Sequence, residues 1–314
     1  MNKLSRESKA ADLLKKYVIV VVLVGMWVVM SIISPSFRTW NNATNIFRQV
    51  SIKGIIALGM TLVILLGCID LTVGSLVAVS GVVAGSILVK DPNAVIPAIL
   101  AAVVVCALFD LLCGFFVAKL NVPPFVATLA GMTAARGMAY VYSNGTPYIL
   151  KSQVFKQLGT GYTPIIIFLS LSLLTHILLT KTKFGRHVYA VGGNAAAAAA
   201  SGINVAKIRC IVYAISGALT GIAGIVLAAR TNSGQPAVGS GYETDVIAAV
   251  AIGGTSMNGG TGTIFGTIIG MLIIGTLQNS MNLLGVSSYW QEIVKGAIII
   301  FAVCFDTISH RRSK

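Results

Sequence analysis

Residues 94–118 read AVIPAILAAVVVCALFDLLCGFFVA, and Asp110 is the only charged residue among these 25. A helix that crosses a bilayer needs about 20 mainly apolar residues, so this run predicts a transmembrane helix. Working outward from it, comparable apolar runs predict ten transmembrane helices in one polytopic all-α membrane protein. The predicted spans are 17–33, 52–69, 71–89, 94–118, 124–143, 164–180, 208–229, a short 242–254, 263–284 and 291–308.

The composition excludes a water-soluble enzyme. Of the 314 residues, 56% are hydrophobic and 10% are charged, whereas a soluble domain is about 25% charged. The same hydrophobicity excludes a disordered chain. The five cysteines form no CxxC pair, and their apolar surroundings indicate small buried residues, not a metal or disulfide framework.

The distribution of positive charge predicts the orientation in the membrane. Lys and Arg outnumber Asp and Glu by 23 to 9, and basic residues collect on cytoplasmic loops. We therefore take the net charge of +14 as a sign of topology, with no nucleic-acid partner. The expected organisation is a cytoplasmic segment 1–16, one transmembrane domain 17–308 with a cytoplasmic loop at 181–207, and a cytoplasmic tail 309–314. Both termini are then cytoplasmic, and some helices are short or broken.

No catalytic or phosphate-binding motif is present. A Walker A loop requires a lysine after its glycines, and the glycine-rich stretch 253–263 contains none. The HExxH and GxSxG motifs are also absent from the sequence. The chain is therefore predicted to be no enzyme, with no catalytic residue, cofactor or metal of its own.

Two charges in predicted spans suggest an intramembrane ion pair. Asp110 and Arg136 lie in adjacent antiparallel spans, about 11 and 14 residues from the turn between them. At 1.5 Å per residue, their depths differ by only ~5 Å. Because an unpaired charge in lipid is costly, we expect them to pair, with either a structural role or a role in the substrate pathway.

Further polar residues are candidates for a translocation pathway. Asp70, Thr72 and Ser75 lie between two apolar runs, in either a solvated turn or a broken helix whose backbone lines a path. The run 242–254 has a similar composition, which weakly suggests an internal repeat. In the ninth span, Gln278, Asn279 and Asn282 form a polar face that either joins helices or lines a pore.

A series of motifs extends over nearly the whole chain. In order they are GMTLVIL (59–65), IDLTVGS (69–75), PFVATL (124–129), RG (136–137), FGR (184–186), GGN (192–194), SGI (201–203), GYE (241–243), GGTS (253–256), GG (259–260) and NLLGVSSY (282–289). Together they resemble the membrane permease subunit of bacterial ABC importers for monosaccharides of the ribose type.

The resemblance implies a division of labour. A periplasmic sugar-binding protein would deliver the sugar, two permease copies in a homodimer would form the path through the lipid of the inner membrane, and a separate cytoplasmic ATPase would bind ATP and Mg and drive alternating access. The coupling residues implied by the family motifs are Gly185, Arg186, Gly192, Gly193, Asn194, Ser201 and Gly202. Ribose is the default sugar, and galactose, xylose, arabinose and allose stay open.

The chain departs from the family pattern at Ala195–Ala200, six consecutive alanines where relatives have larger and charged residues. Alanine favours a helix but offers no salt bridge to a partner. The alanines are either natural, with weakened coupling to the ATPase, or replacements for other side chains. The alternative function is an ion- or proton-coupled secondary transporter of a small polar solute, with Asp70 and Asp110 as its relay.

Overall fold

The computed structural model describes residues 2–311, with the side chains of residues 18–298 and 300. Residue 1 and residues 312–314, at the ends of the predicted segments 1–16 and 309–314, lie outside the described residues. The elements in chain order are α1 (Asn2–Ile33), η1 (Pro35–Arg38), α2 (Trp40–Leu65), α3 (Val73–Lys90), α4 (Val95–Lys119), α5 (Pro124–Ser143), β1 (Tyr148–Ile149), α6 (Gln153–Gln157), α7 (Thr163–Lys181), α8 (Lys183–Gly193), α9 (Ala195–Ala200), α10 (Val205–Thr231), β2 (Ser233–Gly234), α11 (Tyr242–Ile252), α12 (Ile264–Leu283) and α13 (Ser288–Arg311).

The all-α, polytopic membrane architecture is confirmed. Six described helices are long and apolar enough to cross a membrane, namely α2, α3, α4, α7, α10 and α12, and α1 adds the shorter apolar stretch Val18–Ile33. The 11-residue α11 is about 16 Å long, so it cannot cross the hydrocarbon core by itself. The short predicted run 242–254 is therefore only part of a crossing.

The second predicted span starts too late. The structure begins α2 at Trp40, 12 residues before the apolar run at 52–69, because the Thr39 hydroxyl accepts a hydrogen bond from the backbone N–H of Asn42 and caps the helix. Ile46 and Val50 are buried along this first part of the helix. The polar residues between them conceal this part from a search for continuous apolar runs.

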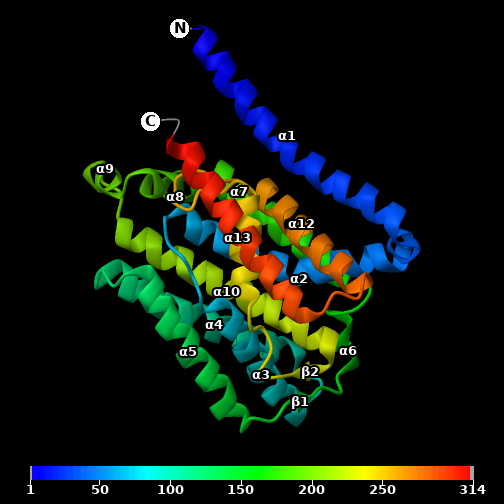
Figure 1. Ribbon diagram of the computed structural model, residues 1–314. Coiled ribbons are helices and arrows are strands. Elements are labelled where there is room, and N and C mark those ends of the chain that lie inside the picture. Colours follow the sequence, from blue (N-terminus) through cyan, green and yellow to red (C-terminus); the bar gives the residue numbers. More distant parts are fainter. Residues whose placement is uncertain (1, 312–314) are drawn as a thin grey trace.

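The two ends of the molecule carry different elements (Figure 1). The short helices α8 and α9 lie at one end, as do the beginning of α1 and the end of α13. The two-stranded sheet of β1 and β2 and the short helix α6 lie at the other end. The strands pair antiparallel, with Tyr148 opposite Gly234.

Helix α10 forms the centre of the bundle and packs against α2, α3 and α4. Its Gly217 and Gly221 allow α4 to approach closely, since a Cβ on Gly217 would clash with the carbonyl of Cys106 and one on Gly221 would lie 2.9 Å from Cα of Val103. Large apolar side chains of α4, α5 and α7 stay exposed, among them Leu100, Val141 and Leu173. Such faces suit contact with lipid.

This packing predicts that Gly217→Ala destabilises the chain, because an added methyl group must push α4 away from α10. Overpacking typically costs about 1–3 kcal/mol, and we expect a lower thermal unfolding midpoint in detergent. The matched control is Gly137→Ala in α5, where an added Cβ meets nothing within 4 Å. Equal midpoints for the two variants would contradict this account of the α4–α10 contact.

Candidate functional site

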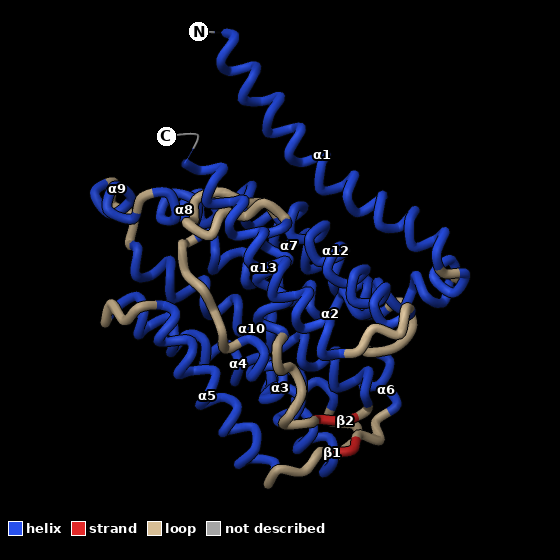
Figure 2. The backbone as a smooth tube through the Cα atoms, in the orientation of Figure 1, coloured by secondary structure: helices blue, strands red, loops and turns tan. Residues whose placement is uncertain are grey.

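The first interruption of the helical backbone, residues 66–72, runs inside the bundle between α2 and α3 (Figure 2). Asp70 and Thr72 are both fully buried, and Thr72 contacts Asp110 of α4. Asp110 lies nine residues before the end of α4, which is about 14 Å along the helix axis. The segment is therefore a broken helix at membrane depth, and the solvated-turn interpretation is wrong.

Asp70 and Asp110 meet at the hydroxyl of Thr72. Thr72 Oγ1 lies 2.6 Å from Asp70 Oδ1 and 2.6 Å from Asp110 Oδ1. Asp70 also accepts the backbone N–H of Thr72 at 3.0 Å and the Ser216 hydroxyl of α10 at 3.0 Å. Asp70 thus satisfies a free donor at the start of α3, and the cluster ties the interruption to α4 and α10. Ser75 is buried in the first turn of α3.

The second interruption, residues 235–241, lies between β2 and α11 and meets the first turn of α3. A Cβ on Gly74, at the start of α3, would clash with the carbonyl oxygen of Gly239 and with the carboxylate of Glu243. The N-terminal ends of α3 and α11 therefore face each other inside the bundle. Glu243 places a negative charge where two helix N-termini concentrate positive partial charge.

Arg136 of α5 joins the second interruption to the first turn of α3. Its Nη1 donates to the carbonyls of Pro236 at 2.7 Å and Val238 at 2.6 Å, and its Nη2 donates to the carbonyl of Gly74 at 3.3 Å. Non-helical backbone at membrane depth leaves carbonyls without helical partners. One planar guanidinium with several donors satisfies two of them, those of Pro236 and Val238, and also contacts the Gly74 carbonyl in the first turn of α3.

The predicted Asp110–Arg136 ion pair does not form. Among the described side chains, neither residue takes part in an ion pair. Helix α5 packs mainly against α3, and α4 mainly against α10 and α3. The two charges therefore have similar positions along the hairpin but face different neighbours, which counting residues from a turn cannot detect.

Removing the Arg136 guanidinium should destabilise the fold strongly. We expect Arg136→Met to lower the free energy of unfolding by about 3 kcal/mol or more, because it leaves the non-helical carbonyls of Pro236 and Val238 without their charged donor. Arg136→Lys should recover only part of this loss, since an ammonium lacks the planar fork. Denaturant titration in mixed micelles measures both.

Arg38→Lys is the control, because Arg38 is exposed and makes no hydrogen bond or ion pair among the described residues. If Arg136→Met is as stable as Arg38→Lys, the guanidinium does not hold the second interruption to α3.

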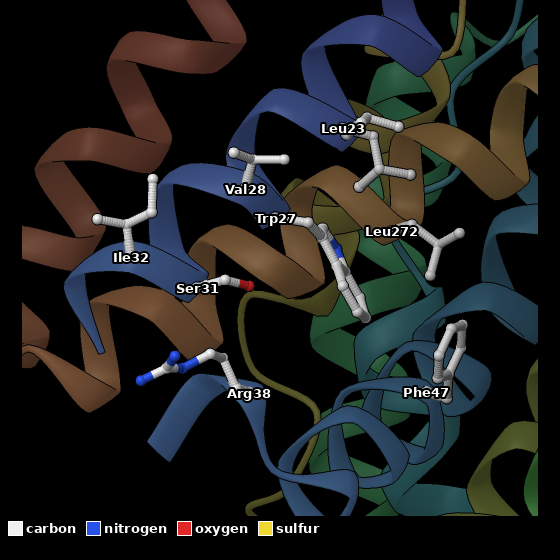
Figure 3. A pocket seen from close by; sticks show the side chains of 9 residues that line it. Leu23, Trp27, Val28, Ser31, Ile32, Arg38, Phe47 and Leu272 are labelled. Atoms are coloured by element: carbon white, nitrogen blue, oxygen red, sulfur yellow. The ribbon is translucent and has the colours of Figure 1, made fainter. Parts of the chain in front are cut away.

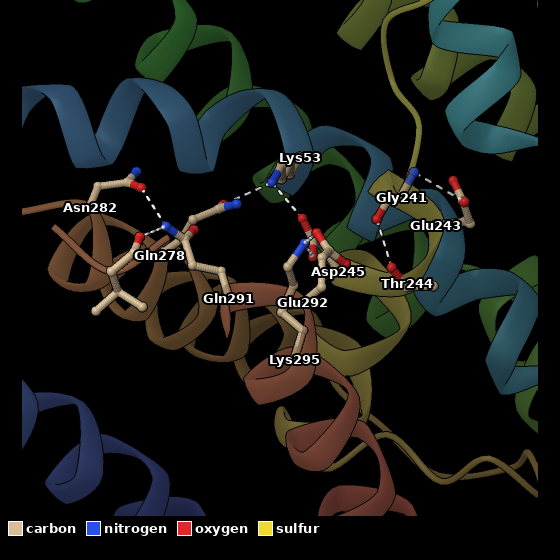
Figure 4. Close-up of polar contacts among 11 residues, drawn as sticks. Lys53, Gly241, Glu243, Thr244, Asp245, Gln278, Asn282, Gln291, Glu292 and Lys295 are labelled. Atoms are coloured by element: carbon tan, nitrogen blue, oxygen red, sulfur yellow. Dashed lines mark hydrogen bonds and ion pairs between the residues drawn. The ribbon is translucent and has the colours of Figure 1, made fainter. Parts of the chain in front are cut away.

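A second polar cluster links α2, α11, α12 and α13 (Figure 4). Lys53 Nζ lies 2.5 Å from Asp245 Oδ2 and donates to Gln278 Oε1 at 2.9 Å. Lys295 Nζ lies 3.3 Å from Asp245 Oδ1 and 2.7 Å from Glu292 Oε1. Asp245 is nearly fully buried between the two lysines. Of the predicted pathway residues, Gln278 belongs to this cluster.

Sequence reasoning missed Lys53 and Asp245. Both lie near the starts of predicted spans, at 52–69 and 242–254, where a charge is expected to face water. Two features of the sequence could have predicted the pair: the two side chains have opposite charges, and each lies one or more residues inside an apolar run.

Replacing one residue of this ion pair should lower the free energy of unfolding more than replacing both. Lys53→Met leaves Asp245 with one weaker cationic neighbour, and loss of a buried partner costs about 3–5 kcal/mol. Adding Asp245→Asn to the same chain should restore part of that loss, as measured by unfolding in mixed micelles. If the double variant is as unstable as the two single losses combined, the pair does not couple.

The other two predicted amides join helices. Asn279 and Asn42 of α2 exchange two hydrogen bonds, at 2.9 and 3.1 Å. Asn282 accepts from Gln291 Nε2 of α13 at 2.9 Å. Each of these two amides thus hydrogen-bonds an amide of another helix, which favours the helix-joining role over a pore lining.

A large apolar cavity, about 840 Å³, lies between α1, η1, α2 and α12 (Figure 3). Its walls include Leu23, Trp27, Phe47 and Leu272, and the indole N–H of Trp27 is occupied by Thr276 Oγ1 at 3.0 Å. Ser31 and Arg38 add the polar and charged side chains of the lining, which are fewer than the several groups that a small polar solute would need. It is therefore not the candidate site for a polar substrate.

The predicted coupling loop folds into two short helices, α8 and α9. The Thr182 hydroxyl caps α8 through Gly185 N–H, and the Asn194 side chain caps α9 through Ala197 N–H. Arg186 and Gly193 are exposed. Gly202, next to Ser201, ends α9 with a positive φ of 82°, a conformation that glycine adopts readily.

Helix α8 contacts the end of α2 and the glycine-rich turn that follows α11. A Cβ on Gly192 would clash with the carbonyl of Leu65, the last residue of α2, and would lie 2.7 Å from Gly260 N. Gly260 N–H itself donates to Leu65 O at 2.9 Å. The Tyr189 hydroxyl donates to Gly262 O at 2.9 Å, and burial raises the pKa of Tyr189, so this donor stays protonated at neutral pH.

Comparison with known proteins identifies a permease family. The family model described as branched-chain amino acid transport system / permease component matches residues 42–303. The ribose import permease protein RbsC of Escherichia coli (strain K12) is 46% identical over 295 residues, which cover 91% of this chain and 92% of that protein. RbsC of Bacillus subtilis (strain 168) is 44% identical, covering 89% and 88%. The L-arabinose ABC transporter permease protein AraH of Azospirillum brasilense is 36% identical, covering 96% and 90%. No solved structure matches the chain.

Proposed function

Because the chain belongs to the branched-chain amino acid transport system / permease component family, we propose that it is the membrane-spanning subunit of an ABC importer for a monosaccharide. Ribose is the first candidate substrate, since two similar permeases are named for ribose import. The chain is a multi-pass protein of the bacterial inner membrane. It has a transport role and no enzymatic one, and ATP hydrolysis belongs to a partner.

One structural observation carries the coupling mechanism. Helix α8 packs against Leu65, directly before the first interruption, and against Gly260 and Gly262, in the turn after α11. A partner that moves α8 therefore moves the end of α2, before the first interruption, and the turn that follows α11. Through them it would move the place where α3 and α11 meet, and alternating access needs such a change inside the membrane.

The topology that fits this function has ten membrane segments and cytoplasmic termini. In it, residues 17–308 form the permease domain, and 1–16, the loop 181–207 and 309–314 face the cytoplasm. The interruption 66–72 with α3, and the interruption 235–241 with α11, each make one crossing in opposite directions. The beginning of α1 and the end of α13 lie at the same end of the molecule as α8, which supports this topology (Figure 1).

The partners follow from the same proposal. A cytoplasmic ATPase, which binds ATP and Mg, docks on α8 and α9 through the coupling residues Gly185, Arg186, Gly192, Gly193, Asn194, Ser201 and Gly202. A periplasmic sugar-binding protein docks at the β1–β2 end. A second copy of the chain completes the path within the lipid. The chain itself holds no cofactor.

The alternative, an ion- or proton-coupled secondary transporter, is not favoured. The similar proteins are named as permeases of import or ABC transport systems. In addition, Asp70 and Asp110 are closed off from solvent by full burial, and a relay needs a water-accessible path.

Uptake by the purified assembly tests the proposed function. Tagged full-length chain would be purified in mild detergent from its native host with its co-purifying proteins, and the complex reconstituted in vesicles with labelled ribose. We expect uptake that requires ATP inside the cytoplasmic-facing compartment and persists with a protonophore. Uptake that needs no ATP but collapses with the protonophore would establish the secondary transporter instead.

The alanine run offers a second test. Ala196 and Ala197 are exposed on α9, whereas Ala198 is buried. Since exposed alanines give a partner no charged contact, we expect Ala196→Glu or Ala197→Arg to raise ATP-driven uptake at least two-fold. Ala198→Glu is the matched control and should not raise it, because its charge would enter the core. No gain from either exposed variant would refute weakened coupling at α9.

A further inference from the structure

The contact between Asp70, Thr72 and Asp110 has an unusual proton requirement. The single hydroxyl of Thr72 lies 2.6 Å from an oxygen of each carboxyl group. A hydroxyl has one proton, so it donates one of these two hydrogen bonds only. The other 2.6 Å contact needs a proton from the carboxyl side, because two acceptors at that distance would repel.

The surroundings also exclude two negative charges. Both aspartates are fully buried, and among the described side chains no Lys, Arg or His nitrogen lies within 4.0 Å of either carboxyl. Arg136, the partner predicted for Asp110, donates to three backbone carbonyls instead. Two unpaired carboxylates side by side in a dry interior would be very unfavourable.

The hydrogen-bond partners decide which carboxyl carries the proton. Asp70 accepts from the Thr72 N–H, the Thr72 hydroxyl and the Ser216 hydroxyl, as an ionised carboxylate requires. Among the described residues, Asp110 has a hydrogen bond to Thr72 alone, and its Oδ2 has no hydrogen-bond partner there. A carboxylate with one bare buried oxygen is costly, whereas the carbonyl oxygen of a neutral acid tolerates it better.

We propose that Asp110 is an uncharged carboxylic acid that donates its proton to Thr72 Oγ1, which in turn donates its own proton to Asp70 Oδ1. The pair then carries one negative charge, on Asp70, beside the N-terminal end of α3, where a negative charge is favourable. Asp110 acts as a positioning residue that fixes the broken backbone to α4. This assignment concerns the chain's own protons and holds whatever solute the chain carries.

Three substitutions separate the acid from the carboxylate. Asp110→Asn keeps a donor to Thr72 Oγ1 and should leave the thermal unfolding midpoint within about 2 °C of the original. Asp110→Val removes the donor, and Asp70→Asn places an amide donor among three donors. Each of these should lower the midpoint by roughly 5 °C or more.

Infrared absorption provides a readout that packing alone would not move. The carbonyl stretch of a protonated carboxyl is separate from the bands of carboxylates, and the chain has only nine acidic residues. At neutral pH we expect a protonated-carboxyl band in the full-length protein that is missing in Asp110→Asn. The absence of this band, its persistence in Asp110→Asn, or equal midpoint losses in Asp110→Asn and Asp70→Asn would each overturn the assignment.

Discussion

The fold depends on the hydrogen bonds from Arg136 to the carbonyls of Gly74, Pro236 and Val238. Two segments, 66–72 and 235–241, leave the helical conformation inside a membrane protein, where water does not satisfy free backbone groups. Arg136 supplies donors to two carbonyls of 235–241 and to Gly74 in the first turn of α3, directly after 66–72. Asp70 accepts the backbone N–H of Thr72, the residue directly before α3. Without these partners, each interruption would cost several free polar groups, and continuous helices would be favoured.

The interruptions give the chain a centre that can respond to its surface. α8 contacts Leu65 and the turn after α11, so the surface helix and the two helix ends form one connected unit. The polar clusters limit where this unit can bend. Asp70 and Asp110 fix the first interruption to α4 and α10, and Lys53 and Asp245 fix α11 to α2. Movement is therefore more easily accommodated by α8 and the glycine-rich turn 253–263 than by the bundle around α10.

Sequence patterns predicted the membrane class, the helices and the break at Asp70, because these depend on hydrophobicity and local backbone preference. The span 124–143 matches α5 at both ends, whereas α2 begins 12 residues early because its first turns are amphipathic. The Asp110–Arg136 pair was wrong, since residue counting gives depth but not the direction in which a side chain faces. The Lys53–Asp245 pair was missed for a related reason: both charges lie near predicted span ends, and only packing shows that Asp245 is buried. The roles of the coupling residues stay predictions.

The most direct test of this account is an experimental density map of the full chain with its partners in lipid nanodiscs, at a resolution that shows side chains. We predict continuous density from the Arg136 guanidinium to the carbonyls of Gly74, Pro236 and Val238, with both interruptions non-helical at membrane depth. An Arg136 side chain turned toward Asp110, or continuous helices through 66–72 and 235–241, would contradict the account.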